Sequence, residues 1–228
     1  MNELRYERLA LGHVEQVAAL HEACFPGYYL TRLGPSFLRA MYGWYVDSPQ
    51  AIAHVALDAD GRVVGFVAGT TRAEAYHRSL FRRRGGAMLA ALAARLIRSP
   101  TDTLRLAWQR KDLLPTALSS ILSRGSSGPI EAAQGPGDEP AAASLVSVGV
   151  EPSQRHSGIG RRLTELFVRE AGQRGCQVVT LSVREDNPGA RLFYESMDWA
   201  KVSESSQAYH GSHSITYQKR MGEEDESR

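Results

Sequence analysis

The sequence predicts a mixed α/β protein whose central sheet is mostly antiparallel, with helices on both faces and a helical insertion between the third and fourth strands. Two apolar runs, 51–57 and 62–70, flank the turn residues Asp58-Ala59-Asp60-Gly61, a pattern typical of an antiparallel hairpin. Further along, strand patterns alternate with amphipathic helical patterns, which indicates right-handed crossovers and some parallel pairing. A sheet built from both units buries its two faces under helices.

The elements before the hairpin follow from apolar spacing and helix breakers. Residues 4–9 form a short strand pattern, and residues 13–24 carry apolar side chains at helical spacing up to the break at Pro26-Gly27. A second helix is expected over 35–46, where Asp47-Ser48-Pro49 ends it.

The stretch after the hairpin is helical in pattern from Thr71 to Lys111, with a weaker third piece reaching Ser123. Residues 125–141 hold four Gly and three Pro and are expected to be a mobile loop or a linker. The elements expected next are a strand at 143–150, a helix at 158–174, a strand at 177–183, a short helix at 188–196, and strands at 199–203 and 213–219.

These elements predict one domain over residues 1–220. Within it, residues 71–124 form a basic helical insertion and residues 125–141 a Gly/Pro-rich loop, while residues 221–228 follow as an acidic tail. The length that remains without 71–141 is ordinary for one domain.

Composition points to a globular protein of the cytoplasm. The 228 residues are 43% hydrophobic and 23% charged, which excludes disorder of the whole chain. The longest apolar run, 87–94, is too short to span a membrane, and the N-terminus lacks the pattern of a signal peptide. Cys24 and Cys176 are in no metal-binding or redox spacing, which fits reduced thiols.

Positive charge is concentrated in the insertion. The net charge of the chain is +2, but ten Lys and Arg residues lie between Arg72 and Asp112 against three acidic residues. The rest of the chain is therefore net acidic.

A strand followed by two glycines at a helix start is the most informative motif. The strand ends near Val150, the turn carries Arg155, and Gly158-Ile159-Gly160 opens an amphipathic helix. Residues without side chains let backbone N–H groups converge on phosphate oxygens, and a helix N-terminus favours negative charge. The alternative is a helix start that only needs flexible residues. A dinucleotide fingerprint is excluded by Leu163 in place of the third Gly, and a P-loop by the absence of Gly-Lys-Ser/Thr.

Residues 145–199 carry a family resemblance. Arg-x-x-Gly-x-Gly at 155–160, directly after a strand ending Val-x-Val-x-Pro, resembles the acyl-CoA signature of the GNAT superfamily of N-acetyltransferases. Residues 187–194, Asn-Pro-Gly-Ala-Arg-Leu-Phe-Tyr, resemble that superfamily's Asn-x-x-Ala-x-x-x-Tyr helix. The element order over 4–70 is compatible, while 71–141 has no counterpart. Asp198 replaces a usual turn glycine, which is expected to reshape that turn.

The resemblance implies acetyl-CoA as acyl donor, no metal, and direct transfer without an acyl-enzyme. It implies that the backbone of Val148 and Val150 pairs with the pantetheine arm, and that Val148 or Gly149 donates to the developing oxyanion. It further implies that Asn187 contacts the cofactor near the thioester and that Tyr194 protonates the departing thiolate, although Tyr194 could also be a packing residue. The implied pyrophosphate site comprises Arg155, His156, Ser157, Gly158, Ile159 and Gly160.

The general base is not evident. Many family members use a carboxylate on the strand before the phosphate loop, but here that strand offers Ser144 and Ser147, with Glu151 at its end. His54, Tyr76 or a chain of water molecules could serve instead, or the amine could arrive partly deprotonated.

Two segments bear on the acceptor. In the family the loop at 25–34 lines the acceptor site, so Tyr28, Tyr29 and Arg32 are candidate contacts, with plain packing as the alternative. In the insertion, a helix over 86–98 is expected to gather Met88, Leu89, Leu92, Leu96 and Ile97 on one side. That helix could pack on the domain, form a homodimer face or recognise an anionic acceptor; a membrane-surface role and nucleic-acid binding are less favoured.

The function predicted is therefore transfer of an acetyl group from acetyl-CoA to the primary amine of a small polar or anionic acceptor, such as an amino sugar. Two alternatives remain. One is an acyl-CoA-binding sensor without catalysis, suggested by the missing base. The other is an acetyltransferase acting on protein lysines or N-termini.

Overall fold

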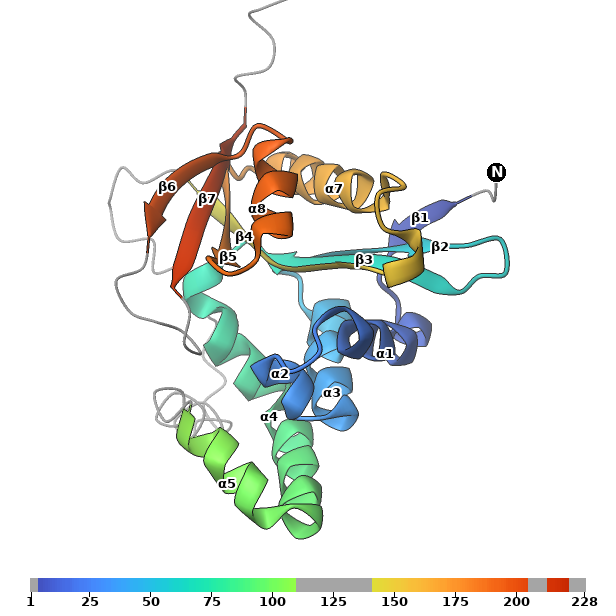
Figure 1. Ribbon diagram of the computed structural model, residues 1–228, viewed down its shortest axis with the longest axis vertical. Helices are drawn as coiled ribbons and strands as arrows, with labels where there is room; N and C mark the ends of the chain where they lie inside the picture. Colours follow the sequence, from blue (N-terminus) through green and yellow to red (C-terminus); the bar gives the residue numbers. More distant parts are fainter. Residues whose placement is uncertain (1–3, 110–140, 205–212, 222–228) are drawn as a thin grey trace, which may run out of the picture.

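A seven-stranded sheet forms the centre of the molecule in the computed structural model (Figure 1). The structure describes residues 4–109, 141–204 and 213–221. The strands are β1 (Arg5–Arg8), β2 (Ala51–Leu57), β3 (Val63–Thr70), β4 (Ala142–Val150), β5 (Val178–Arg184), β6 (Ala200–Glu204) and β7 (Ser214–Arg220). Their order is β1-β2-β3-β4-β5-β7-β6, and every neighbouring pair is antiparallel except β4–β5. The predicted fold class is confirmed.

Helices cover both faces of this sheet, as Figure 1 shows. On one face lie α7 (Ile159–Gln173) and α8 (Pro188–Glu195); on the other lie α1 (Val14–Cys24), α2 (Tyr29–Arg32), α3 (Pro35–Asp47), α4 (Ala73–Arg98) and α5 (Pro100–Gln109). Each face has its own apolar cluster, because alternate strand residues point to opposite sides. Short 3-10 turns at Leu11–His13 and Pro152–Gln154, and the one-turn α2, were not expected from the sequence.

The alternation of strands and helices after residue 142 indicates more parallel pairing than the sheet contains. β4 and β5 are parallel, but β7 inserts between β5 and β6 and pairs antiparallel with both. The sheet is therefore mostly antiparallel, as predicted.

The first half of the insertion is part of the core. α4 begins at Ala73, and its Tyr76, Leu80 and Met88 join the apolar cluster of α1 and α3. Arg84 also forms an ion pair with Asp47 of α3. The expectation of one apolar side was wrong in part, because Leu89, Leu96 and Ile97 are exposed. The third helical piece, the Gly/Pro-rich loop except Ala141, and the acidic tail except Met221 lie outside the described residues.

The turn before β6 also differs from expectation. Asp198 adopts φ 60°, the left-handed conformation that glycine takes easily and that aspartate tolerates. The residue therefore keeps a glycine-like turn and does not reshape it. Within the described ranges, no helix is long and apolar enough to cross a membrane.

Candidate functional site

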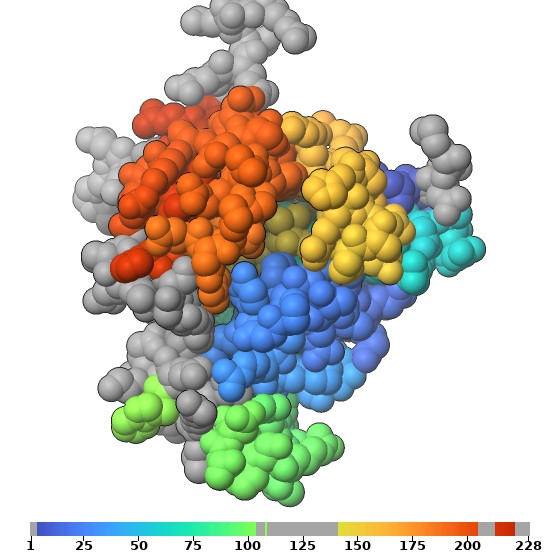
Figure 2. Space-filling model, viewed as in Figure 1, coloured from blue at the N-terminus to red at the C-terminus, as the bar shows by residue number. Residues whose placement is uncertain are grey.

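The two parallel strands separate soon after they meet. β4 and β5 pair only over Ala142–Ser144 and Val178–Thr180, although β4 continues to Val150 and β5 to Arg184. Beyond Ser144, β4 stays paired with β3 along one edge, while its other edge has no strand partner among the described residues. Figure 2 shows a recess at this place, where β4 lies between the N-terminal helices (blue), the segment after β4 (yellow) and the region of α8 (orange).

Backbone groups of β4 face this opening. The amide of Glu151 donates to Val64 O of β3 at 2.9 Å. Alternate residues of a strand direct their N–H and C=O groups to opposite edges, so Val150 and Val148 direct theirs to the open side. The Cys24 thiol donates to the Val150 carbonyl at 3.2 Å from that side. Between them, Gly149 has no room for a side chain, because a Cβ would lie 2.7 Å from the Phe66 ring.

The segment after β4 brings free amides to the same edge. His156 and Gly158 both have positive φ, 63° and 86°, which turns the chain sharply into α7. The first-turn amides of α7 have no partner inside the helix, and the helix N-terminus carries partial positive charge. Ile159 is buried against β3 and fixes this end of the helix to the sheet. A negatively charged group fits here.

The three arginines of this region have different surroundings. The Arg155 side chain is exposed and interacts with the Cys24 thiol. Arg161 instead donates to the Ser196 carbonyl at the end of α8, at 3.0 Å, and Arg162 pairs with Glu165 at 3.7 Å. Arg155 is thus the arginine of the three that the structure leaves beside the opening.

The helix α8 lies next to this loop. The Phe193 ring is 3.6 Å from the position of a Cβ at Gly160, so α8 and the start of α7 are neighbours. Asn187 caps α8, because its Oδ1 accepts from the Ala190 amide at 3.0 Å. Tyr194 is 5% exposed and packs against the rings of Trp199 and Tyr217. Burial raises its pKa, so the phenol keeps its proton.

Known proteins share this motif and this arrangement. The family model of the Acetyltransferase (GNAT) family matches residues 127–199. A curated relative, mycothiol acetyltransferase from Kocuria rhizophila, is 40% identical over 67 residues, which are 29% of this chain and 22% of that protein. The chain resembles the GNAT family over this stretch. It spans only about a fifth of the curated relative it matches.

Solved GNAT structures have the same fold at low identity. The ribosomal-protein-S18-alanine N-acetyltransferase from Escherichia coli superposes with a TM-score of 0.54 and 12% identity, covering 99% of each chain. NAA60 from Arabidopsis thaliana, solved in complex with acetyl-CoA, gives a TM-score of 0.55 and 16% identity, covering 96% of this chain and 99% of that one. The likeness shows the fold.

The face of this GNAT fold opposite α7 carries the expected acceptor residues. The guanidinium of Arg184 lies over the Tyr28 ring, with Cζ 5.2 Å from the ring centre. This contact joins the α1–α2 connection to the end of β5. Arg184 is itself held by both oxygens of Asp186. Arg32 lies 3.8 Å from Asp102 of α5, and Tyr29 packs against the α1–α3 cluster. The structure therefore places Tyr28 and Arg32 on the face of the sheet opposite α7. Tyr29 packs in the apolar cluster on the same face.

The alternative bases lie elsewhere in the GNAT fold. Tyr76 is buried, accepts a hydrogen bond from the Tyr45 hydroxyl at 2.9 Å, and has its pKa raised to about 12 by burial. Glu151 bonds to Arg62 at 3.2 Å. His54 belongs to β2, two strands from β4 in the sheet.

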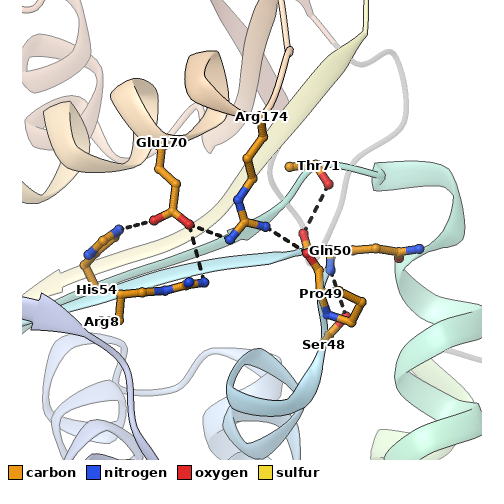
Figure 3. A network of polar contacts seen from close by, with 8 residues as sticks. All are labelled: Arg8, Ser48, Pro49, Gln50, His54, Thr71, Glu170 and Arg174. Atoms are coloured by element: carbon orange, nitrogen blue, oxygen red, sulfur yellow. Dashed lines mark hydrogen bonds and ion pairs between the residues drawn. The ribbon is translucent and has the colours of Figure 1, made fainter.

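His54 takes part in a structural network, shown in Figure 3. Its Nε2 lies 2.6 Å from Glu170 of α7, which also pairs with Arg8 of β1 and with Arg174. Arg174 in turn donates to the Pro49 carbonyl at 2.8 Å. This network ties the end of α7 to β1 and β2, away from the opening.

Sequence reasoning missed three residues near the opening. The sequence around Arg184 gave no indication of a functional role, because an arginine at the end of a strand has no distinctive local pattern. His21 and Tyr42 read as apolar-face positions of α1 and α3, yet His21 Nδ1 lies 2.7 Å from the Tyr42 hydroxyl in the buried layer under β4.

Proposed function

We propose that the chain is an acetyl-CoA-dependent N-acetyltransferase that moves an acetyl group directly to a primary amine. The observation that carries the proposal is the separation of β4 from β5 beside a free-amide loop. An unpaired strand edge can bind an extended amide-containing arm as an added strand, and the loop can hold a pyrophosphate. Acetyl-CoA contains both groups. The proposal takes residues 1–220 as one catalytic domain.

Residue roles follow from these positions. The backbone of Val148 and Val150 pairs with the pantetheine arm. The amide of Val148 donates to the developing oxyanion, because the backbone groups of Gly149 point toward β3. The loop from Arg155 to Gly160 holds the pyrophosphate. Asn187 has its Oδ1 engaged in the cap, so its NH₂ group is what remains for the cofactor. Tyr194 donates to the departing sulfur.

The acceptor we infer is a small polar or anionic amine. The name of the curated relative, a mycothiol acetyltransferase, supports a small molecule. The Tyr28, Arg32 and Arg184 side chains supply aromatic and cationic contacts on the acceptor side. The second candidate is a protein N-terminus; the name of the Escherichia coli neighbour gives an alanine of ribosomal protein S18 as its acceptor.

The test has two stages. Calorimetry with acetyl-CoA and with CoA measures donor binding, and release of free thiol is then followed with glucosamine, glucosamine 6-phosphate, lysine and a peptide beginning with alanine. Saturable binding and thiol release with an amino sugar support the proposal. Release with the peptide alone would identify a protein acetyltransferase, and binding without release from any amine would identify a sensor. Absence of acetyl-CoA binding would refute all three.

A further inference from the structure

Two contacts hold the Arg184 side chain at the end of β5. Its Nε donates to Asp186 at 2.8 Å, and its Nη2 donates to the other oxygen of the same carboxylate. The Tyr28 ring covers one face of the guanidinium, with Cζ 5.2 Å from the ring centre. Leu181 and Val183 point to the α7 side of the sheet, so Arg184 points to the opposite side. This cation is therefore held in one orientation on the acceptor side.

The pairing register places Arg184 across the opening from Val148. The last pair that joins β4 and β5 is Ser144 with Thr180. Four residues further along both strands, the same register puts Arg184 level with Val148, whose backbone groups face the opening. A strand-like arm between the two strands sets their backbones about 10 Å apart. A thioester bound at Val148 thus lies between Val148 and Arg184.

The segment from Cys24 to Tyr28 contacts both strands where they diverge. The Cys24 thiol donates to the Val150 carbonyl of β4 at 3.2 Å, and the Tyr28 ring meets Arg184 of β5. Gly27, at φ 79°, turns the chain between these two contacts. The opening is therefore bordered on the acceptor side by a short segment that also holds Arg184.

The guanidinium keeps one edge for a ligand. Arginine has five N–H donors, of which Asp186 takes one at Nε and one at Nη2. Among the described residues, Nη1 of Arg184 has no hydrogen-bond partner. The edge formed by Nη1 and Nη2 matches the paired oxygens of a carboxylate or a phosphate. With the side chain 27% exposed, an anion can reach this edge, which points away from the Asp186 carboxylate.

We propose that Arg184 is a specificity-determining residue that binds the anionic group of the acceptor, a carboxylate or a phosphate, through Nη1 and Nη2. Tyr28 is a positioning residue that holds the guanidinium plane. Because the gap is about 10 Å wide, the acceptor carries its anionic group within about that distance of the amine. The inference rests on the proposed function and narrows its acceptor class to compact anionic amines.

Binding at Arg184 also orients the acceptor. An anion fixed on one side of the gap leaves the amine at the other end of a short molecule, beside the thioester at Val148. Holding two reacting groups in this way replaces part of the entropy that their encounter costs. An amine without the anion has to find the same position unaided, so the effect is expected mainly in KM.

Acceptors that differ in charge alone test this role. The pairs are glucosamine 6-phosphate with glucosamine, and lysine with lysinamide, each followed by thiol release at saturating acetyl-CoA. We expect the wild type to favour the anionic member of one pair by about tenfold or more in kcat/KM, because a bidentate contact to a charged group is lost in its partner. The pair that shows the preference identifies the anion as phosphate or carboxylate.

Variants assign the preference to Arg184. Arg184→Gln should raise KM for the favoured anionic acceptor about 10- to 100-fold and change kcat/KM for its uncharged partner less than about threefold. Arg184→Lys keeps the charge without the planar edge and should fall between. Tyr28→Leu should raise the same KM about 3- to 10-fold, whereas Tyr28→Phe keeps a ring and should stay within about twofold. Arg169→Gln changes an exposed arginine of α7 on the other face and should match the wild type.

A second readout does not require turnover. With CoA bound, calorimetry gives the dissociation constant of the favoured anionic acceptor, which should rise about tenfold or more in Arg184→Gln and stay unchanged in Arg169→Gln. Acetyl-CoA affinity should be unchanged in both variants, which shows that they are folded.

The outcomes separate this role from the proposed function. Equal kcat/KM for both members of each pair in the wild type, or an equal loss for both in Arg184→Gln, would overturn the role while leaving the transferase intact. Acetylation of the alanine peptide alone would overturn the acceptor class. Binding of acetyl-CoA with no acetyl transfer to any amine would instead refute the proposed function, and with it this role.

Discussion

Tyr194 occupies an apolar layer at the end of α8, between Phe193, Trp199 and Tyr217. Burial raises its pKa above that of a free phenol, because the charged form is poorly solvated there. A thiol ordinarily has a pKa near 8.5, so complete proton transfer to a solvated thiolate would be uphill. In the role proposed for Tyr194, the phenol would therefore act as a fixed donor to a sulfur that is itself desolvated as it leaves.

Replacement of Tyr194 by Phe tests this. We expect kcat to fall about 10- to 100-fold, the loss of one hydrogen bond to a charged group, with acetyl-CoA affinity unchanged. Steady-state thiol release and calorimetry make the comparison. Turnover equal to the wild type would assign Tyr194 to packing.

At the scale of elements, the loop between β4 and α7 depends on backbone shape. Gly158 has φ 86°, and no other atom lies within 4 Å of a Cβ built there. An L-residue in this conformation is strained by about 1 kcal/mol, and its Cβ would occupy open space beside the amides that are proposed to bind the pyrophosphate. Gly175, after α7, has φ 81° and is equally open, but lies at the opposite end of that helix from Gly158.

The pair Gly158→Ala and Gly175→Ala separates strain from binding. Both should lower the free energy of unfolding by about 1 kcal/mol. Only Gly158→Ala should raise the acetyl-CoA dissociation constant, about tenfold or more, the equivalent of one lost charge-assisted contact. Equal affinities of the two variants in calorimetry would remove this loop from the binding site.

The α4 helix has two unlike parts. Leu80 is 5% exposed and packs in the cluster of α1 and α3, whereas Leu89 is 50% exposed. The first part thus completes a core that the remaining helices leave open.

We expect Leu80→Ala to lower the free energy of unfolding by about 2–4 kcal/mol, because it leaves a cavity. Leu89→Ala should change it by less than about 0.5 kcal/mol. Urea unfolding of both variants gives the comparison. Similar small effects would show that α4 is an appendage to the core.

At the scale of the whole molecule, the half-buried Glu170 and the buried His21 make stability depend on pH. Burial would raise the pKa of Glu170, but hydrogen bonds from Arg174 and His54 and the charge of Arg8 outweigh it and lower the pKa. The contribution of ionised Glu170 to the free energy of unfolding is present above the pKa that Glu170 has in the unfolded chain, and it is lost as the pH falls through the lower pKa of the folded state. His21 acts in a milder range, because burial lowers its pKa from 6.5 to about 4.

The sign for His21 follows from proton binding. Between pH 6.5 and about 4 the unfolded chain protonates His21 and the folded chain does not, so stability falls as pH falls through that window. The full effect is about 3 kcal/mol. Urea unfolding at pH 7.5, 6.5, 5.5 and 5 should show the decline.

The matched variants locate that decline. His21→Gln should be less stable at pH 7.5 but should flatten the slope between pH 6.5 and 5. His156→Asn changes an exposed histidine with positive φ and should keep the slope. A slope that survives His21→Gln would place the titration in another group.

The sequence by itself determined the elements, their order and the phosphate motif. Periodicity, turn residues and helix breakers act over a few residues, which is why the hairpin at 51–70 and the start of α7 were placed within a residue or two. The same locality explains what went wrong. Exposure of Leu89, Leu96 and Ile97 depends on where α3 ends beneath α4, and the Asp198 turn depends on its packing context.

Only the tertiary structure decided which residues meet at the opening. Cys24 and the Val150 carbonyl are separated by 126 positions, and Tyr28 meets Arg184 across the sheet. The separation of β4 from β5, and the contact between His21 and Tyr42, arise from how two helical layers pack on a twisted sheet. Packing of this kind is a property of surfaces that no single segment of the sequence contains.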